Sequence, residues 1–292
     1  MKWGNDMLTL KNWNAQRYLI LHADDFGMCH STNQAILELF AQGAITSTTL
    51  MLPCPWAREA AAAAHSDSQL DVGVHLTSTS EWEFYKWGPI HQQPGAQALT
   101  DEFGSFPPDS QYMPDVDPTI VRAEMVAQIK LAQSLGVDPT HLDNHMGSLR
   151  NIHHRLLIEL GAEYELPVRF SAHPAYASGD ETEISALARE LGVLHPDTVI
   201  GLPFTYSQEQ DYEWARDHVI QLLRGLQPGV TEMLFHPSLE TEELKAITDS
   251  WPYRLFDYQL FLDPEVLRVM EEEKIVRIGW RELRDLQRSL RH

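Results

Sequence analysis

Short apolar runs alternate with helical patterns along most of this chain, and this alternation limits the folds that it can adopt. The first run, Tyr18–Leu21, has four consecutive apolar residues, as expected of a strand that is buried on both faces. Residues 31–42 follow with apolar side chains at helical spacing, and Gly43 lies just past their end. Repeated units of strand and helix predict an α/β fold with a parallel sheet, either open or closed into a barrel.

The same alternation predicts the remaining elements. Further strands are expected at residues 48–52, 72–76, 140–145, 167–170, 198–201, 230–235 and 275–278, and helices at 56–65, 120–135, 152–163, 183–191, 212–226, 264–273 and 281–291. No internal repeat, low-complexity segment or Gly-Ser linker separates them, so residues 1–292 are expected to form a single domain.

Residues 80–118 interrupt this rhythm with a long stretch rich in aromatic residues and proline. Its aromatic side chains include Trp82, Tyr85, Trp87 and Tyr112. A long connection of this kind is often functional, so we expect a loop or lid on the substrate side of the protein. The alternative is a satellite hydrophobic cluster that only covers a barrel end.

The composition narrows the class of protein. Hydrophobic residues make up 43% of the 292 residues and charged residues 22%, which suits a globular domain. The formal net charge of −20 repels phosphate backbones and anionic membranes, so nucleic acid and membranes are expected to be poor partners. Two cysteines, Cys29 and Cys54, are too few for a disulfide framework. With no apolar signal segment in residues 1–17 and no run long enough for a membrane span, a cytoplasmic location is expected.

Polar residues that bind metals or move protons stand at the ends of four predicted strands. They are the pair Asp24-Asp25, then His75, the segment His141–His145, and His236. In a parallel α/β fold the carboxyl ends of the strands meet at one edge, where active sites form. His75 or His236 alone would be interpreted as a core or loop histidine, and each gains weight only from this shared position.

Adjacent carboxylates such as Asp24 and Asp25 repel each other unless a cation or a proton intervenes. If the backbone stays extended, the two side chains diverge, so that one can bind a metal while the other faces the substrate. The alternative is that one of them caps the helix that follows Gly27, a common role of aspartate near a helix start.

His141, Asp143 and His145 occupy alternate positions, which share one face of a strand. Pro139 before them and Gly147 after them leave room for a short strand but not for a helix of ordinary length. Clustered histidine and aspartate suit a borderline divalent ion such as zinc, or iron, cobalt or nickel. The alternative is a hydrogen-bonded ladder in the core.

Together these residues resemble the YdjC-like carbohydrate deacetylases, a family that includes the chitooligosaccharide deacetylase and a hopanoid-biosynthesis deacetylase. The matching segments run in the family's order from about residue 17 to residue 283 and are Ala23–Gly27, Thr46–Thr49, Gly73–Leu76, Pro139–His145 and Phe235–Pro237. The resemblance implies a distorted (β/α) barrel of about seven parallel strands. It also implies an enzyme, a hydrolase that removes an acetyl group from an N-acetylated sugar or oligosaccharide.

The resemblance further implies one divalent metal ion, Mg or Zn, held by one aspartate and two histidines. At the matching positions these ligands are Asp25, His75 and His145. Asp24 is implied as the general base, and His236 matches a histidine that acts as an acid or binds substrate. His141 and Asp143 are expected behind the ligands, because a ligating imidazole needs a partner that fixes its tautomer.

Two positions beside the expected metal depart from the family's pattern. The family commonly has further histidines where this chain has Met146-Gly147-Ser148, and it usually has asparagine in place of His22. Both changes could alter the substrate or the preferred ion.

A small carbohydrate is the expected partner, and assembly into a homo-oligomer is left open. One alternative is a metal-dependent hydrolase or isomerase that acts on another sugar, for example a phosphorylated one, although no basic or Gly-rich phosphate cradle is evident in the sequence. The other alternative is a non-catalytic sugar-binding barrel.

Overall fold

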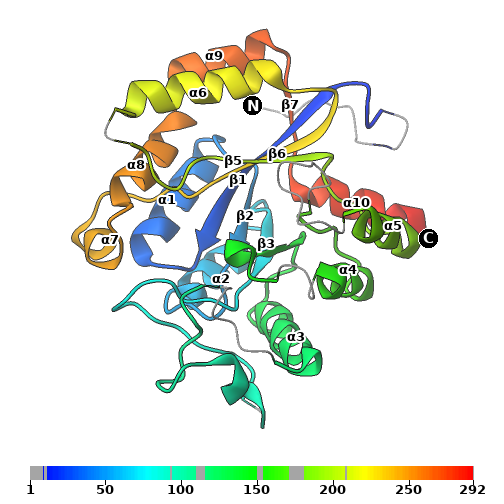
Figure 1. The fold of residues 1–292 in the computed structure, drawn as a ribbon. Coiled ribbons are helices and arrows are strands. Elements are labelled where there is room, and N and C mark those ends of the chain that lie inside the picture. The colour runs from blue at the N-terminus through cyan, green and yellow to red at the C-terminus, as the bar shows by residue number, and fades with distance from the viewer. Residues whose placement is uncertain are drawn as a thin grey trace.

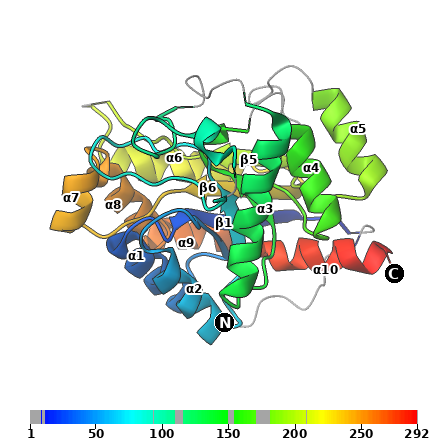
Figure 2. The ribbon, with the colours of Figure 1, turned by 90° about the horizontal axis from the view of Figure 1, so that it is seen from below.

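The computed structural model describes residues 9, 12–92, 94–109, 116–149, 154–170, 181–207 and 209–291. Within them a parallel sheet curls into a half-barrel, and helices pack around its outer side (Figures 1 and 2). Its seven strands are β1 (Arg17–Phe26), β2 (Ser47–Leu50), β3 (Val72–Leu76), β4 (Leu142–Asn144), β5 (Thr198–Gly201), β6 (Gly229–Phe235) and β7 (Val276–Arg277). They run in the spatial order β4-β3-β2-β1-β6-β5, with β7 paired to β1. The predicted α/β fold on a curled parallel sheet is confirmed.

The strand expected at residues 167–170 is reduced to a single bridge between Val168 and Leu142 of β4. Pro167 has no N–H to donate, so the segment is held by isolated bonds, such as the one from Arg169 N to Leu142 O at 2.9 Å. In the described residues the sheet is therefore not closed into a full barrel between β4 and β5.

Ten α-helices accompany the strands in the described part of the chain. They are α1 (His30–Ala41), α2 (Ala57–Ser66), α3 (Pro118–Ser134), α4 (His154–Glu163), α5 (Glu181–Leu191), α6 (Tyr212–Gly225), α7 (Glu242–Ile247), α8 (Trp251–Leu260), α9 (Pro264–Glu272) and α10 (Trp280–Arg291). Eight lie close to predicted ranges, whereas α7 and α8 fall in a stretch for which no helix is predicted. Both are short, and α8 is rich in aromatic residues of low helix propensity, so tertiary packing decides their conformation.

The side chains of β1 alternate between two environments. Leu19 and Leu21 pack into the main core beneath the helices, whereas Tyr18 belongs to a second, smaller core cluster. Because successive strand residues point to opposite faces, His22 and Asp24 share the face of Tyr18. This face lines the interior of the half-barrel, which is apolar below and polar at the carboxyl end of the strands.

Trp280, the first residue of α10, separates the apolar floor from the polar upper part of this interior. Its indole stacks on the His141 ring with centroids 4.3 Å apart, and its Nε1–H donates to Glu232 Oε1 at 2.9 Å. Neighbouring strands add polar side chains to the same interior, namely Thr49 from β2, His75 from β3, Asp143 from β4 and Glu232 from β6. The strand alternation therefore places the candidate site.

No helix in the described part of the chain is long and apolar enough to cross a membrane. Cys29 and Cys54 are both free and buried.

Candidate active site

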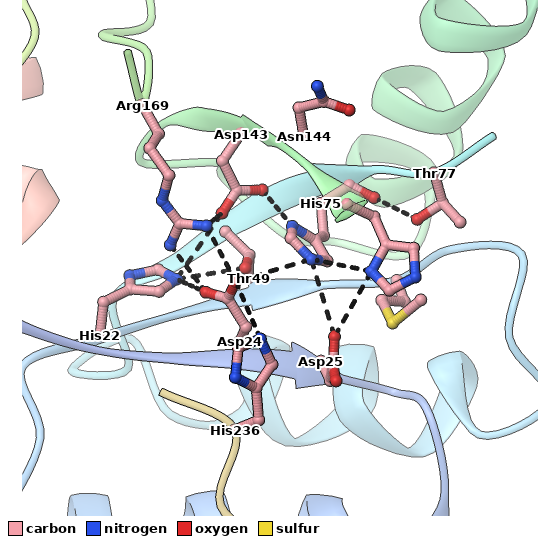
Figure 3. Close-up of polar contacts among 12 residues, drawn as sticks. His22, Asp24, Asp25, Thr49, His75, Thr77, Asp143, Asn144, Arg169 and His236 are labelled. Atoms are coloured by element: carbon pink, nitrogen blue, oxygen red, sulfur yellow. Dashed lines mark hydrogen bonds and ion pairs between the residues drawn. The ribbon is translucent and has the colours of Figure 1, made fainter. Parts of the chain in front are cut away.

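Asp24 and Asp25 lie at the carboxyl end of β1 and point into the same site (Figure 3). The pairing of β1 with β2 is irregular here, and Asp25 adopts a left-handed backbone with φ of 72°. This local turn brings the two carboxylates together, whereas an extended backbone would make them diverge. Asp24 Oδ2 and Asp25 Oδ1 lie 3.8 and 3.7 Å from the same atom, His75 Nε2. The N-cap of α1 is Cys29, so the alternative that an aspartate caps this helix is wrong.

Asp25, His75 and His145 bring three potential metal-ligating atoms together. His145 Nδ1 lies 3.2 Å from His75 Nε2 and 3.6 Å from Asp25 Oδ1, and all three side chains are buried. Asp25 Oδ1 is buried without a hydrogen-bond partner among the described residues. A carboxylate oxygen that lacks a donor and faces two imidazole nitrogens fits a divalent cation. The fold thus brings together the three residues that the resemblance implies as ligands.

Each of the two imidazoles is held on its outer side by a carboxylate. His75 Nδ1 lies 2.5 Å from Asp143 Oδ1, and His145 Nε2 lies 3.1 Å from Glu81 Oε2. A carboxylate in this position fixes which ring nitrogen carries the proton and leaves the other nitrogen free for a cation. Asp143 lies behind a potential ligand, where it was expected, and Glu81 is a contact that sequence analysis does not identify.

Charged neighbours shift the pKa values of His145 and Asp25 in the direction opposite to burial. Burial lowers the pKa of His145, but Glu81 and Asp25 outweigh it and raise the pKa to about 10. Burial raises the pKa of Asp25, but Arg254 and His145 outweigh burial and hold the pKa well below its usual value. Arg254 Nη1 donates to Asp25 Oδ2 at 2.9 Å. A cation that binds here must therefore displace a proton from His145.

Asp24 is held by Arg169, which approaches both carboxylate oxygens. Arg169 Nη1 donates to Oδ2 at 2.9 Å and Nη2 to Oδ1 at 2.7 Å. Burial raises the pKa of Asp24, but Arg169 and His22 outweigh it, so the pKa lies well below its usual value and the carboxylate stays ionised. The same guanidinium pairs with Asp143 at 2.8 Å and with Glu232 at 2.9 Å. One arginine thus pairs with three buried carboxylates.

His22 and His141 lie in the interior of the half-barrel, His22 next to Asp24 and His141 next to Trp280. His22 Nε2 is 3.1 Å from Asp24 Oδ1 and 3.2 Å from Thr49 Oγ1. His141 packs against His22 with ring centroids 5.0 Å apart, and burial lowers its pKa well below the usual value. His141 therefore contacts the ring beside Asp24 and the indole of Trp280, and its contacts do not include the three potential ligands in the described structure.

His236 follows β6 and faces Asp24, with 3.7 Å between its Nε2 and Asp24 Oδ2. Its backbone N–H donates to Asp257 Oδ2 at 2.7 Å. The Phe204 ring, which is 51% exposed, lies over the imidazole with centroids 4.3 Å apart. Burial lowers the pKa of His236 to about 4, so the imidazole is neutral at pH 7. If His236 acts as an acid, it must gain its proton during the reaction.

The model of the family described as YdjC-like protein matches residues 18–272 of this chain. The chain belongs to the YdjC-like family. Its relatives include two proteins named carbohydrate deacetylase. The one from Thermus thermophilus is 30% identical over 283 residues, which cover 96% of this chain and 98% of the relative. The one from Thermoanaerobacter pseudethanolicus is 28% identical over 264 residues, which cover 89% and 96%.

A solved structure from Enterococcus faecalis, provisionally described as a cellobiose-phosphate cleavage protein, is also similar. It superposes with a TM-score of 0.75 at 27% identity and covers 92% of this chain and 99% of that chain. The resemblance to the YdjC-like family is therefore confirmed, and so is the expectation of a hydrolase.

Of the two departures from the family pattern that the resemblance indicates, residues 146–148 directly follow His145, whereas His22 lies beside Asp24. Met146 has a positive φ of 52° and is 42% exposed. Ser148 is buried, and its Oγ donates to Asn144 Oδ1 at 3.1 Å and contacts Ser78 Oγ at 2.7 Å. An exposed apolar side chain and a buried, hydrogen-bonded serine thus follow His145 in this chain.

The loop after β3, whose course is drawn in Figure 1, contacts the same site through Glu81 and Trp87. The Trp87 indole N–H donates to Thr79 O at 2.7 Å, and the ring lies 6.2 Å from that of His145. Phe103, farther along, is 86% exposed, and Tyr112 lies outside the described residues. The loop of this YdjC-like protein therefore has one part in contact with the potential metal ligands and another part that projects into solvent.

Four charged residues of the site are not identified by sequence analysis, namely Glu81, Arg169, Glu232 and Arg254. Two of them carry a signal, because Glu232 interrupts the apolar run of β6 and Arg169 interrupts the short run at residues 167–170. A charged side chain inside an apolar strand must find a buried partner. Glu81 and Arg254 have no such signal, since they lie in a loop and in α8.

Proposed function

We propose that this YdjC-like protein is a metal-dependent deacetylase that hydrolyses the N-acetyl group of a sugar or oligosaccharide. One observation carries the proposal: Asp24 Oδ2 lies 3.8 Å from His75 Nε2, a potential ligand atom, and 3.7 Å from His236 Nε2. A base and a proton carrier thus stand side by side at the edge of the potential metal site. The names of the relatives supply the reaction type, and amide hydrolysis needs these groups.

We assign one divalent ion to Asp25, His75 and His145. Two imidazoles and one carboxylate are typical ligands of catalytic zinc, whereas magnesium prefers oxygen ligands, so zinc is the better match of the two expected ions. When bound, such an ion lowers the pKa of a water molecule and polarises a carbonyl oxygen.

Asp24 accepts the proton of the attacking water in this proposal. The water oxygen bonds to the carbonyl carbon, and the C–N bond then breaks to give a free amine and acetic acid, which keeps the second proton of the water until it ionises to acetate. The amine nitrogen needs a proton to leave. Because the neutral His236 lies 3.7 Å from Asp24 Oδ2, the proton taken by Asp24 can pass through His236 to that nitrogen. The proton that the amine needs thus comes from the attacking water, and no other acid is required.

A neutral sugar suits the charges of the site better than the phosphorylated sugar suggested by the description of the Enterococcus faecalis structure. Phosphate is held by unpaired cations or by a cradle of backbone N–H groups. Both arginines of the described site are already paired, Arg169 with Asp24 and Arg254 with Asp25. Phe204 instead offers an exposed aromatic face, on which the apolar side of a sugar ring can stack.

The test is acetate release by the zinc-loaded protein from a panel of N-acetylated monosaccharides and oligosaccharides, with a phosphorylated disaccharide as the comparison. We expect acetate from at least one N-acetylated sugar, loss of that activity on chelation, and recovery with zinc. If metal-loaded protein releases no acetate from any of them, the proposal is wrong. Cleavage of the phosphorylated disaccharide alone would favour the second candidate. A cytoplasmic location is part of the same proposal and is checked by cell fractionation.

A further inference from the structure

Two adjacent residues of the loop after β3 reach the potential metal site, one by contact with a potential ligand and the other by contact with an arginine that pairs with a second one. Both carboxylate oxygens of Glu81 lie near His145 Nε2, at 3.2 and 3.1 Å. The Trp82 ring lies 5.7 Å from the guanidinium carbon of Arg254, which in turn pairs with Asp25. One short loop segment therefore supports two of the three potential ligands.

The contact from Glu81 decides which nitrogen of His145 is free. Because a carboxylate accepts hydrogen bonds and does not donate them, His145 must carry a hydrogen on Nε2. With that hydrogen in place, Nδ1 can offer a lone pair to a cation, and this is the atom that faces Asp25 Oδ1 and His75 Nε2. Asp143 likewise contacts the outer nitrogen of the His75 ring, Nδ1. Asp143, however, belongs to strand β4, whereas Glu81 belongs to the loop after β3.

The loop segment itself is anchored to the body of the protein. The Tyr85 hydroxyl donates to Met28 O at 2.6 Å, outside the loop, and the Lys86 ammonium donates to Ser80 O at 2.7 Å within the loop. The Glu81 side chain is 18% exposed, so its contact with His145 is largely shielded from water. Such shielding strengthens a charge-assisted hydrogen bond.

We propose that Glu81 is a positioning residue of the metal centre, which sets the tautomer of His145 and couples the loop around Glu81 and Trp82 to the bound cation. The proposal rests on the assignment of the ion to Asp25, His75 and His145. Coupling of this kind is reciprocal: if the Glu81 contact strengthens cation binding, cation binding must strengthen the contact to the same extent.

The first experiment measures zinc affinity by competition with a chromophoric chelator, using the full chain. Loss of a partner behind a ligating histidine typically weakens metal binding about 10- to 100-fold, which is the effect expected for Glu81→Ala. Glu81→Gln keeps an acceptor oxygen and should recover a large part of this loss. Glu83→Gln is the matched control, because it removes the same charge from an exposed position two residues away and should leave the affinity unchanged.

The second experiment measures backbone hydrogen exchange in the loop around Glu81. Zinc should slow exchange in this segment of the unmodified protein and of Glu83→Gln, and should have little effect on it in Glu81→Ala. Far-UV circular dichroism shows whether each variant is folded. If Glu81→Ala is not folded, Glu81→Leu carries the test, because leucine keeps most of the side-chain volume but has no acceptor oxygen for His145.

Zinc affinity of Glu81→Ala within twofold of the unmodified protein would overturn the proposal. Equal losses in Glu81→Ala and Glu83→Gln would overturn it as well, because the effect would then reflect total charge. Neither readout involves acetate, so the outcome is separate from that of the deacetylase proposal. A protein that binds zinc through Glu81-dependent positioning but releases no acetate would contradict only the reaction.

Discussion

Arg169 donates two parallel hydrogen bonds to Asp24, one of 2.9 Å to Oδ2 and one of 2.7 Å to Oδ1. This pairing fixes the carboxylate plane and keeps it ionised, while Oδ2 still faces His75 and His236. The same guanidinium also pairs with Asp143, which holds His75. The orientation of the proposed base and that of one proposed ligand therefore depend on one arginine.

Arg169→Lys should lower kcat for acetate release while zinc remains bound. Lysine keeps the charge but cannot make the paired contact with Asp24, so we expect a loss of about 10- to 100-fold, since a small displacement of a catalytic group costs this much. Arg169→Met should also lower the free energy of unfolding in urea by about 3–5 kcal/mol, because it leaves buried carboxylates without their counter-charge. Activity of Arg169→Lys equal to that of the unmodified protein would show that the paired geometry is not needed.

The buried Asp257 should make stability depend on pH. Burial raises the pKa of Asp257 to about 7. The hydrogen bond from the backbone N–H of His236 and the positive charge of Arg254 only partly offset this rise. The folded protein thus retains a proton that the unfolded chain loses near pH 4, and the associated stability is lost as the pH rises from about 4 through 7. Asp257→Asn removes this titration and keeps an acceptor for His236. We expect the variant to gain stability relative to the unmodified protein between pH 5 and pH 8, by at most about 4 kcal/mol. Parallel stability curves for the two proteins in urea across this range would contradict the shift.

Phe204→Ala should raise KM for an N-acetylated oligosaccharide and leave kcat within twofold. The Phe204 ring is exposed directly beside His236, and loss of an aromatic contact costs about 1 kcal/mol, which corresponds to about fivefold in KM. Phe103→Ala removes an equally large exposed ring from the loop and serves as the control. An unchanged KM in Phe204→Ala would remove Phe204 from the substrate contacts.

Sequence analysis predicts the parallel sheet and places the acidic pair and the histidines at one edge of it, because apolar runs and the polar residues that end them are local features. It does not predict how Asp24 and Asp25 converge, since that depends on the left-handed backbone of Asp25 at an irregular point of β1. It places no helix between residues 237 and 263, where α8 supplies both Arg254 and Asp257.

The partners of the site residues are the hardest part to predict. Glu81 reaches His145 across 64 positions in the chain, and Arg254 reaches Asp25 across 229. Only tertiary packing brings such pairs together, and neither residue has a local pattern that sets it apart. Glu232 differs, because a carboxylate inside an apolar strand indicates a buried partner before the structure is known.

Zinc content, measured by elemental analysis, tests most directly whether Asp25, His75 and His145 hold one divalent ion. The variants are Asp25→Asn, His75→Ala and His145→Ala, with His65→Ala, an exposed histidine of α2, as the control. Asparagine is chosen at position 25 because it keeps an acceptor for Arg254, whose charge would otherwise be buried without a partner. We predict about one zinc per chain in the unmodified protein and in His65→Ala, and less than about a tenth of that in the three variants, all of which remain folded. Retention of stoichiometric zinc by the three folded variants would contradict the account.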